Sequence, residues 1–95
     1  MITLQTQVVT HPDVIATALS NQEMVLLHMA TQQYYTLNET GTQIWEGVAK
    51  AQSLAEIGQG LEMRYDIDLA QAEQQVVALV TGLAAEDLIQ VVRSA

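Results

Sequence analysis

Side chains that could carry catalysis are few in this chain. It has two histidines, His11 and His28, and no cysteine. His28 lies in an apolar segment, where a histidine is more often a packed residue than a general base. No nucleophile has an evident base partner, and the spacing of potential ligands matches no common metal motif or phosphate-binding loop. Glu39 and Glu46 are typical of solvated charges on a helix. The sequence therefore predicts no enzyme activity, no metal site and no cofactor.

The chemistry that the sequence does favour is backbone pairing with an extended peptide. Residues 33–37, QYYTL, are rich in β-forming side chains and contain no Lys, no Pro and no acidic residue. Such residues usually protect an edge strand from further pairing. As the last strand of a predicted three-stranded meander, this segment would lie at a sheet edge and could accept an added strand. Two alternatives are that the strand is merely short, or that the N-terminal segment covers it.

A helix predicted from residue 69 to about residue 86 could form the second wall of a peptide groove. Its expected core stripe consists of Leu69, Ala72, Val76, Leu79 and Leu83. Val77, Val80 and Ala84 widen the apolar arc beyond one core contact, which indicates either deep burial or a groove wall. Beside an open strand edge, we favour the groove. The predicted peptide-binding residues are Gln33, Tyr34, Tyr35, Thr36, Glu73, Val77, Val80, Thr81 and Ala84.

Charge excludes one class of partner. Eleven acidic residues face three basic ones, which gives a formal net charge of −8. Nucleic-acid affinity comes largely from Lys and Arg that neutralise phosphates, so the chain should be repelled by DNA, RNA and anionic membranes. The helix over residues 69–86 contains Glu73 and Glu86 but no Lys or Arg. Solubility explains the acidity, and attraction of a basic partner is the alternative.

The elements that must position these residues form a single domain. Strands are predicted at residues 14–19, 24–29 and 33–37, and the middle strand is so apolar that we expect it to be covered on both faces. Helices should begin after Asn38, at the capping box of Ser53 and Glu56, and after Asp68. A short strand is predicted at residues 88–92. The fold class is therefore α+β and winged helix-turn-helix-like, with a three-stranded antiparallel sheet followed by three helices.

The remaining N-terminal residues, 1–13, read as a lead-in with room for a strand at residues 3–9, before a domain over residues 14–95. The lead-in has neither the basic region nor the apolar stretch of a signal peptide, and no run is long enough to span a bilayer. We therefore expect a cytoplasmic protein. The sequence leaves the oligomeric state open.

The segment from Tyr35 to Glu46, YTLNETGTQIWE, resembles the motif of PqqD-like proteins, also called RiPP recognition elements. They include the discrete leader-recognition proteins of lasso-peptide clusters. Residues 53–57, 65–68 and 76–89 resemble later parts of the same pattern, so the likeness covers about residues 14–92. One departure is Asp87, because such sequences usually place Gly after the third helix. Asp tolerates the left-handed conformation that such a position requires.

The resemblance implies a domain without chemistry of its own. It would bind the leader segment of a ribosomally synthesised precursor peptide as a strand added to the third strand, in a cleft closed by the third helix. The precursor would then be presented to a separate modifying enzyme, such as a transglutaminase-like protease or a radical enzyme, as in lasso-peptide or PQQ biosynthesis. The alternative function is a winged-helix interaction or regulatory subunit that binds another protein.

Overall fold

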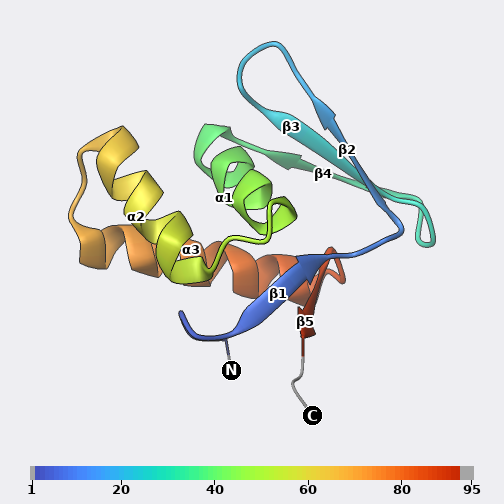
Figure 1. The fold of residues 1–95 in the computed structure, drawn as a ribbon. Coiled ribbons are helices and arrows are strands. Elements are labelled where there is room, and N and C mark those ends of the chain that lie inside the picture. Colours follow the sequence, from blue (N-terminus) through green and yellow to red (C-terminus); the bar gives the residue numbers. More distant parts are fainter. Residues whose placement is uncertain (1, 93–95) are drawn as a thin grey trace.

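The computed structural model describes residues 2–92. Met1 and residues 93–95, which the predicted domain boundaries include, lie outside this part. The described elements, in chain order and shown in Figure 1, are β1 (Gln7–Thr10), β2 (Val14–Ala18), β3 (Met24–His28), β4 (Gln33–Leu37), α1 (Glu39–Ala49), α2 (Leu54–Tyr65), α3 (Leu69–Ala85) and β5 (Ile89–Val92). The predicted order of strands and helices, and the winged helix-turn-helix-like α+β class, are confirmed.

The meander forms an antiparallel sheet in the order β2-β3-β4. Its register pairs Leu26 with Ala16 on one side and with Tyr35 on the other. Along β3, burial alternates: Leu26 is fully buried, whereas Val25 and Leu27 are only half-buried. The expectation that this strand is covered on both faces is therefore wrong. Successive side chains of a strand point to opposite faces, and only one face of β3 meets the hydrophobic core.

Local capping sets the helix starts where the sequence predicts them. The Asn38 side chain accepts a hydrogen bond from the Gly41 amide at 2.8 Å. Ser53 and Glu56 form a complete capping box, in which each side chain accepts from the other residue's amide. The Asp68 carboxylate accepts from the amide of the second residue of α3, at 3.4 Å. Each cap satisfies an amide that has no partner within its helix.

The C-terminus of α3 is a Schellman motif. The Leu88 amide donates to the Leu83 carbonyl at 2.9 Å, and the Asp87 amide donates to the Ala84 carbonyl at 3.0 Å. Asp87 has a φ of 61°, in the left-handed region. This left-handed conformation is the one expected at Asp87, because similar sequences usually have Gly at this position.

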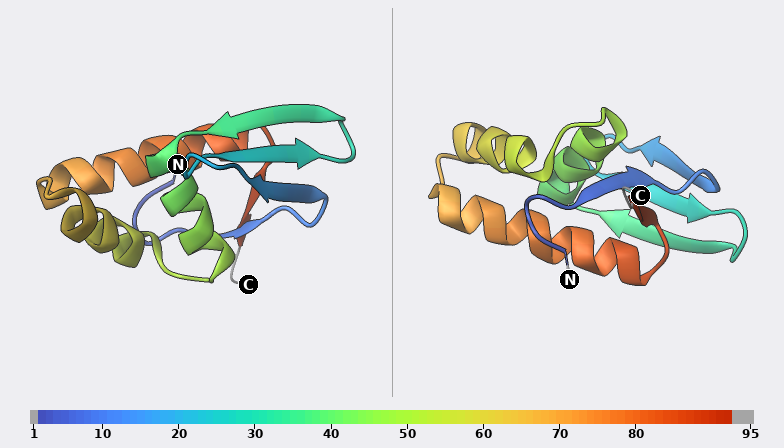
Figure 2. Two further views of the ribbon diagram at one scale, coloured as in Figure 1. Left: turned by 90° about the horizontal axis from the view of Figure 1, so that it is seen from above. Right: turned by 60° about the horizontal axis from the view of Figure 1, so that its bottom comes forward.

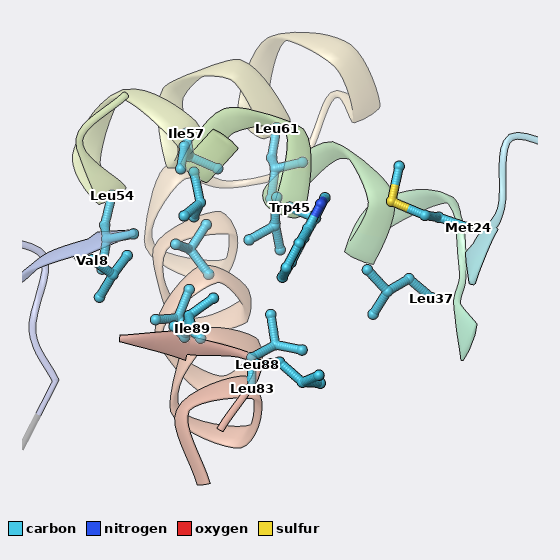
Figure 3. Close-up of a cluster of buried hydrophobic side chains, with 14 of the residues drawn as sticks. Val8, Met24, Leu37, Trp45, Leu54, Ile57, Leu61, Leu83, Leu88 and Ile89 are labelled. Carbon is cyan, nitrogen blue, oxygen red and sulfur yellow. The ribbon is translucent and has the colours of Figure 1, made fainter. Parts of the chain in front are cut away.

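One hydrophobic core joins both sheets and all three helices. Figure 3 shows Trp45 among side chains that include Leu61 of α2 and Leu88 from the C-terminal segment. Trp45 is 4% exposed, as expected of a core anchor. Helices α1 and α2 approach closely at Gly47, where an added Cβ would lie 2.6 Å from Ile57 Cγ1. A side chain at residue 47 would therefore push α1 and α2 apart.

The N-terminal lead-in takes part in the core. Its strand, β1, begins later than expected, at Gln7, and pairs antiparallel with β5, as Val8 does with Val91. Val8 and Ile89 are both buried. The predicted C-terminal strand is thus present, and the two ends of the described chain are joined in a second, two-stranded sheet. No helix among residues 2–92 is long and apolar enough to cross a membrane.

Candidate binding groove between β4 and α3

Strand β4 is an outer strand of the three-stranded sheet, and within residues 2–92 its second edge pairs with no other strand. Both views in Figure 2 show β4 beside the C-terminal half of α3. In an antiparallel ladder, alternate residues direct their N–H and C=O groups to opposite edges. Part of the β4 backbone therefore remains free to pair with an added strand.

The opposite edge of this sheet, along β2, is also unpaired in the described part of the chain. However, β2 lies on the side of the sheet away from α3, as Figure 2 shows. Four of its five residues are exposed. A peptide on β2 would meet no second wall, so the β4 edge is the better candidate site.

The flank of α3 next to the start of α1 carries Leu79. Leu79 is half-buried and, with Gln75 and Ala78, borders an open hollow of about 520 Å³ that extends to Asn38, Gly41 and Ile44 at the start of α1. Since α1 follows β4 directly, this hollow adjoins the end of the free strand. It can receive an apolar side chain of a bound peptide.

Glu86, at the end of α3, marks the other end of the groove. The Tyr35 hydroxyl lies 2.9 Å from Glu86 Oε2 and 2.7 Å from Gln33 Oε1, and its single proton can be donated to either oxygen. The hydrogen bond to Glu86, partial burial and the Glu86 charge together raise the pKa of Tyr35 above 10.0. The groove therefore runs from the apolar Leu79 to a polar, acidic end.

The predicted β4 residues lie on the outer strand of the sheet. Gln33, Tyr35 and Leu37 point to one face of the sheet, and Tyr34 and Thr36 point to the other. Tyr35 is half-buried beside the core, whereas Tyr34 is 71% exposed. Because the two residues are neighbours, the N–H and C=O groups of one point to the free edge and those of the other point to β3.

The predicted roles of Val80 and Leu79 are reversed. Val80, expected on the groove wall, is fully buried, whereas Leu79, expected in the core, is only half-buried. The buried stripe of α3 runs through Ala72, Val76, Val80 and Leu83. Neighbouring residues on a helix differ by about 100° in direction. If the predicted orientation of the helix about its axis is wrong by less than this angle, a core residue and a wall residue can already be exchanged.

Other predicted α3 residues lie away from β4. Val77 and Glu73 border a hollow that includes Leu4 of the lead-in. Thr81 follows Val77 by four residues, so it shares that flank, and Ala84 packs against the core. The structure does not bring these side chains to the free strand. The wall residues predicted from the sequence do not include Gln75 and Glu86. Gln75 is four residues before Leu79 and Glu86 is seven residues after it, so both lie on the same side of the helix as Leu79. This spacing could have identified them once the orientation of the helix was known.

Comparisons with known proteins show a family and two similar folds. The family model of coenzyme PQQ synthesis protein D (PqqD) matches residues 23–89. One similar solved structure, "TbiB1 in Complex with the TbiA(beta) Leader Peptide", is 23% identical, with a TM-score of 0.83 over 90% of this chain and 99% of that chain. Another, "Lasso peptide synthetase B1 complexed with the leader peptide", is 26% identical, with a TM-score of 0.81 over 88% of this chain and 98% of that chain.

No curated protein sequence matches the chain. The family match nevertheless spans most of its length, from β3 through β4 and all three helices to the start of β5. The predicted resemblance is confirmed, and the chain belongs to the PqqD family.

Proposed function

We propose that this protein binds the leader segment of a ribosomally synthesised precursor peptide as a strand added to β4. The observation that carries the proposal is the free β4 edge, which lies beside α3 and ends next to the hollow that the half-buried Leu79 borders. Membership of the PqqD family supports it. So does the similarity to a 26% identical lasso peptide synthetase B1 that was solved with a leader peptide.

Recognition would combine two contributions. Main-chain hydrogen bonds to residues 33–36 give affinity for any extended segment, and the hollow beside Leu79 selects an apolar side chain. Since alternate residues of a strand point the same way, every second residue of the leader faces α3. The proposed contact residues are Gln33, Tyr34, Tyr35 and Thr36 on β4 and Gln75, Leu79 and Glu86 on α3.

The protein would act as a carrier rather than a catalyst. Its leader-bound form presents the precursor to a separate enzyme, for which a transglutaminase-like protease or a radical enzyme is our proposal. We assign binding to residues 14–95, with residues 1–13 as a lead-in whose strand β1 completes the core, and we place the protein in the cytoplasm.

The test is calorimetric titration with the leader peptide of the precursor encoded beside this protein. We expect saturable binding with a Kd between about 1 μM and 1 nM, which corresponds to roughly −8 to −12 kcal/mol. Lack of binding to any precursor leader from the same genomic neighbourhood would contradict the proposal.

Proline substitutions locate the site. At Tyr34 and at Thr36, Pro removes one amide of β4, and an edge strand tolerates this where the amide is not bonded to β3. Whichever variant keeps the melting temperature of the wild type should bind the leader at least about tenfold more weakly. The matched controls are Ala16→Pro and Thr17→Pro on the opposite edge strand, β2. A folded β2 variant should bind normally, and equal binding by a folded β4 variant would place the peptide elsewhere.

A further inference from the structure

Three side chains able to bind a metal ion meet at the end of the sheet next to the groove. His11 precedes β2, His28 ends β3, and Asp87 lies in the turn between α3 and β5. His28 Nε2 lies 3.4 Å from Asp87 Oδ2, and His11 Nε2 lies 3.6 Å from the same oxygen. One ligand atom from each residue falls within 4.8 Å of the others. These residues play no part in the proposed peptide groove.

His28 is the buried member of this cluster. Its side chain is 2% exposed, and among residues 2–92 neither of its imidazole nitrogens has a hydrogen-bond partner. Buried polar side chains almost always have such a partner, and an unsatisfied one calls for an explanation. The His28 Nε2 atom lies 3.4 Å from Asp87 Oδ2, so one ion can contact both atoms.

The distances distinguish a bound cation from direct hydrogen bonding. A charge-assisted bond from a histidine to a carboxylate spans about 2.7–2.9 Å, so both contacts, at 3.4 and 3.6 Å, are too long. Around a tetrahedral zinc ion with bonds of about 2.0–2.1 Å, neighbouring ligand atoms stand roughly 3.3–3.4 Å apart. The two distances to Asp87 are close to this spacing, and the three ligand atoms all lie within 4.8 Å of one another.

We propose that His11, His28 and Asp87 form a binding site for Zn²⁺. Two imidazoles and one carboxylate suit zinc, whereas Ca²⁺ and Mg²⁺ prefer oxygen ligands alone. The Asp87 side chain is 67% exposed. It thus provides an entry path from solvent and leaves the fourth coordination position open to water.

His11 must exchange one bond for another when the ion binds. Its Nδ1 accepts a hydrogen bond from the Asp13 amide at 3.0 Å, so in the neutral ring the proton is on Nε2. Coordination through Nε2 moves this proton to Nδ1 and breaks the bond to Asp13. Zinc binding should therefore shift the NMR resonance of the Asp13 amide, and this shift reports whether His11 binds the ion.

The three proposed ligands come from three separate segments of the chain. A zinc ion would join the three segments that carry its ligands. It would also steady the neighbouring groove end, because Glu86 precedes Asp87 and Gln33 pairs with His28. The ion would thus have a structural role.

The test uses the tag-free full chain after treatment with a chelator. Titration with ZnCl₂ should show one tight equivalent and raise the melting temperature, and Co²⁺ should give the visible absorption of a tetrahedral site. Asp87→Asn and His28→Gln should each weaken zinc binding by at least about tenfold.

Asp66→Asn is the matched control, because Asp66 is also an exposed aspartate with a positive φ, 52°, but lies in the turn between α2 and α3. It should bind zinc as the wild type does. Asp87 is on the surface, so Asp87→Asn remains informative even where His28→Gln does not fold. The proposal is overturned if the wild type binds no stoichiometric zinc, or if Asp87→Asn binds it as tightly as Asp66→Asn.

Discussion

The Tyr35 hydroxyl and the Glu86 carboxylate, 51 residues apart in sequence, lie 2.9 Å apart and join the free strand β4 to the end of α3. The contact links the strand and the helix that form the two walls of the proposed groove. The bond is made on the surface, so it adds little to stability.

The first prediction concerns the titration of Tyr35. Its pKa is raised above 10.0 in the folded protein, chiefly by the hydrogen bond to Glu86. The stability that this bond contributes is fully present below pH 10 and is lost as the pH rises through the folded pKa. Glu86→Gln removes the charge and should lower the pKa of Tyr35. Phenolate absorbance, taken as the difference from Tyr35→Phe, measures it; an unchanged pKa in Glu86→Gln would show that the contact is not formed in solution.

A second prediction compares the two flanks of α3. Leu79→Asp places a charge in the hollow beside β4, whereas Val77→Asp places it on the flank that faces Leu4. We expect Leu79→Asp to weaken leader binding by at least tenfold, about 1.4 kcal/mol, and Val77→Asp to change it little. Affinity and melting temperature should be measured on both variants. Stronger weakening by Val77→Asp would move the groove to the other flank.

Burial along α3 sets a third prediction. Leu83 is 5% exposed and packs in the core, so Leu83→Ala should lower the free energy of unfolding by about 2–5 kcal/mol. Leu79→Ala should cost clearly less, because Leu79 is only half-buried. Urea denaturation of the two variants gives the comparison, and equal losses would mean that Leu79 is a core residue after all.

Two glycines provide a fourth prediction, about helix packing. Gly47→Ala forces a methyl group to within 2.6 Å of Ile57 and should destabilise the protein by about 1–3 kcal/mol. At Gly60, within α2, an added Cβ meets nothing within 4 Å. Gly60→Ala should therefore stabilise the protein by about 0.5–1 kcal/mol, because Ala loses less backbone entropy in a helix. Thermal or urea unfolding tests both signs.

The fifth prediction is that the protein does not shift duplex DNA at physiological salt. In a winged helix-turn-helix protein, α3 would take the recognition position, yet it contains Glu73 and no Lys or Arg. It therefore lacks the cations that neutralise phosphates. A salt-sensitive shift at micromolar protein in a gel assay would contradict this.

Features that depend on near neighbours in sequence could be predicted from the sequence. The caps at Asn38, Ser53 and Asp68 involve residues two to three positions apart, so their hydrogen bonds follow from residue types alone. The order of strands and helices follows from the change of hydrophobic period after Leu37. The motif from Tyr35 to Glu46 indicated the family, and the absence of basic residues in α3 argued against nucleic acid.

Only the tertiary structure decided which face of α3 meets the core. An apolar arc that includes Val76, Val77, Leu79 and Val80 allows several orientations of the helix, and packing against α2 and β5 selects the one that buries Val80 and leaves Leu79 at the groove. The cluster of His11, His28 and Asp87 has the same origin. Its members come from three distant segments, so no local spacing indicates it, and the fold alone brings their ligand atoms within 4.8 Å of one another.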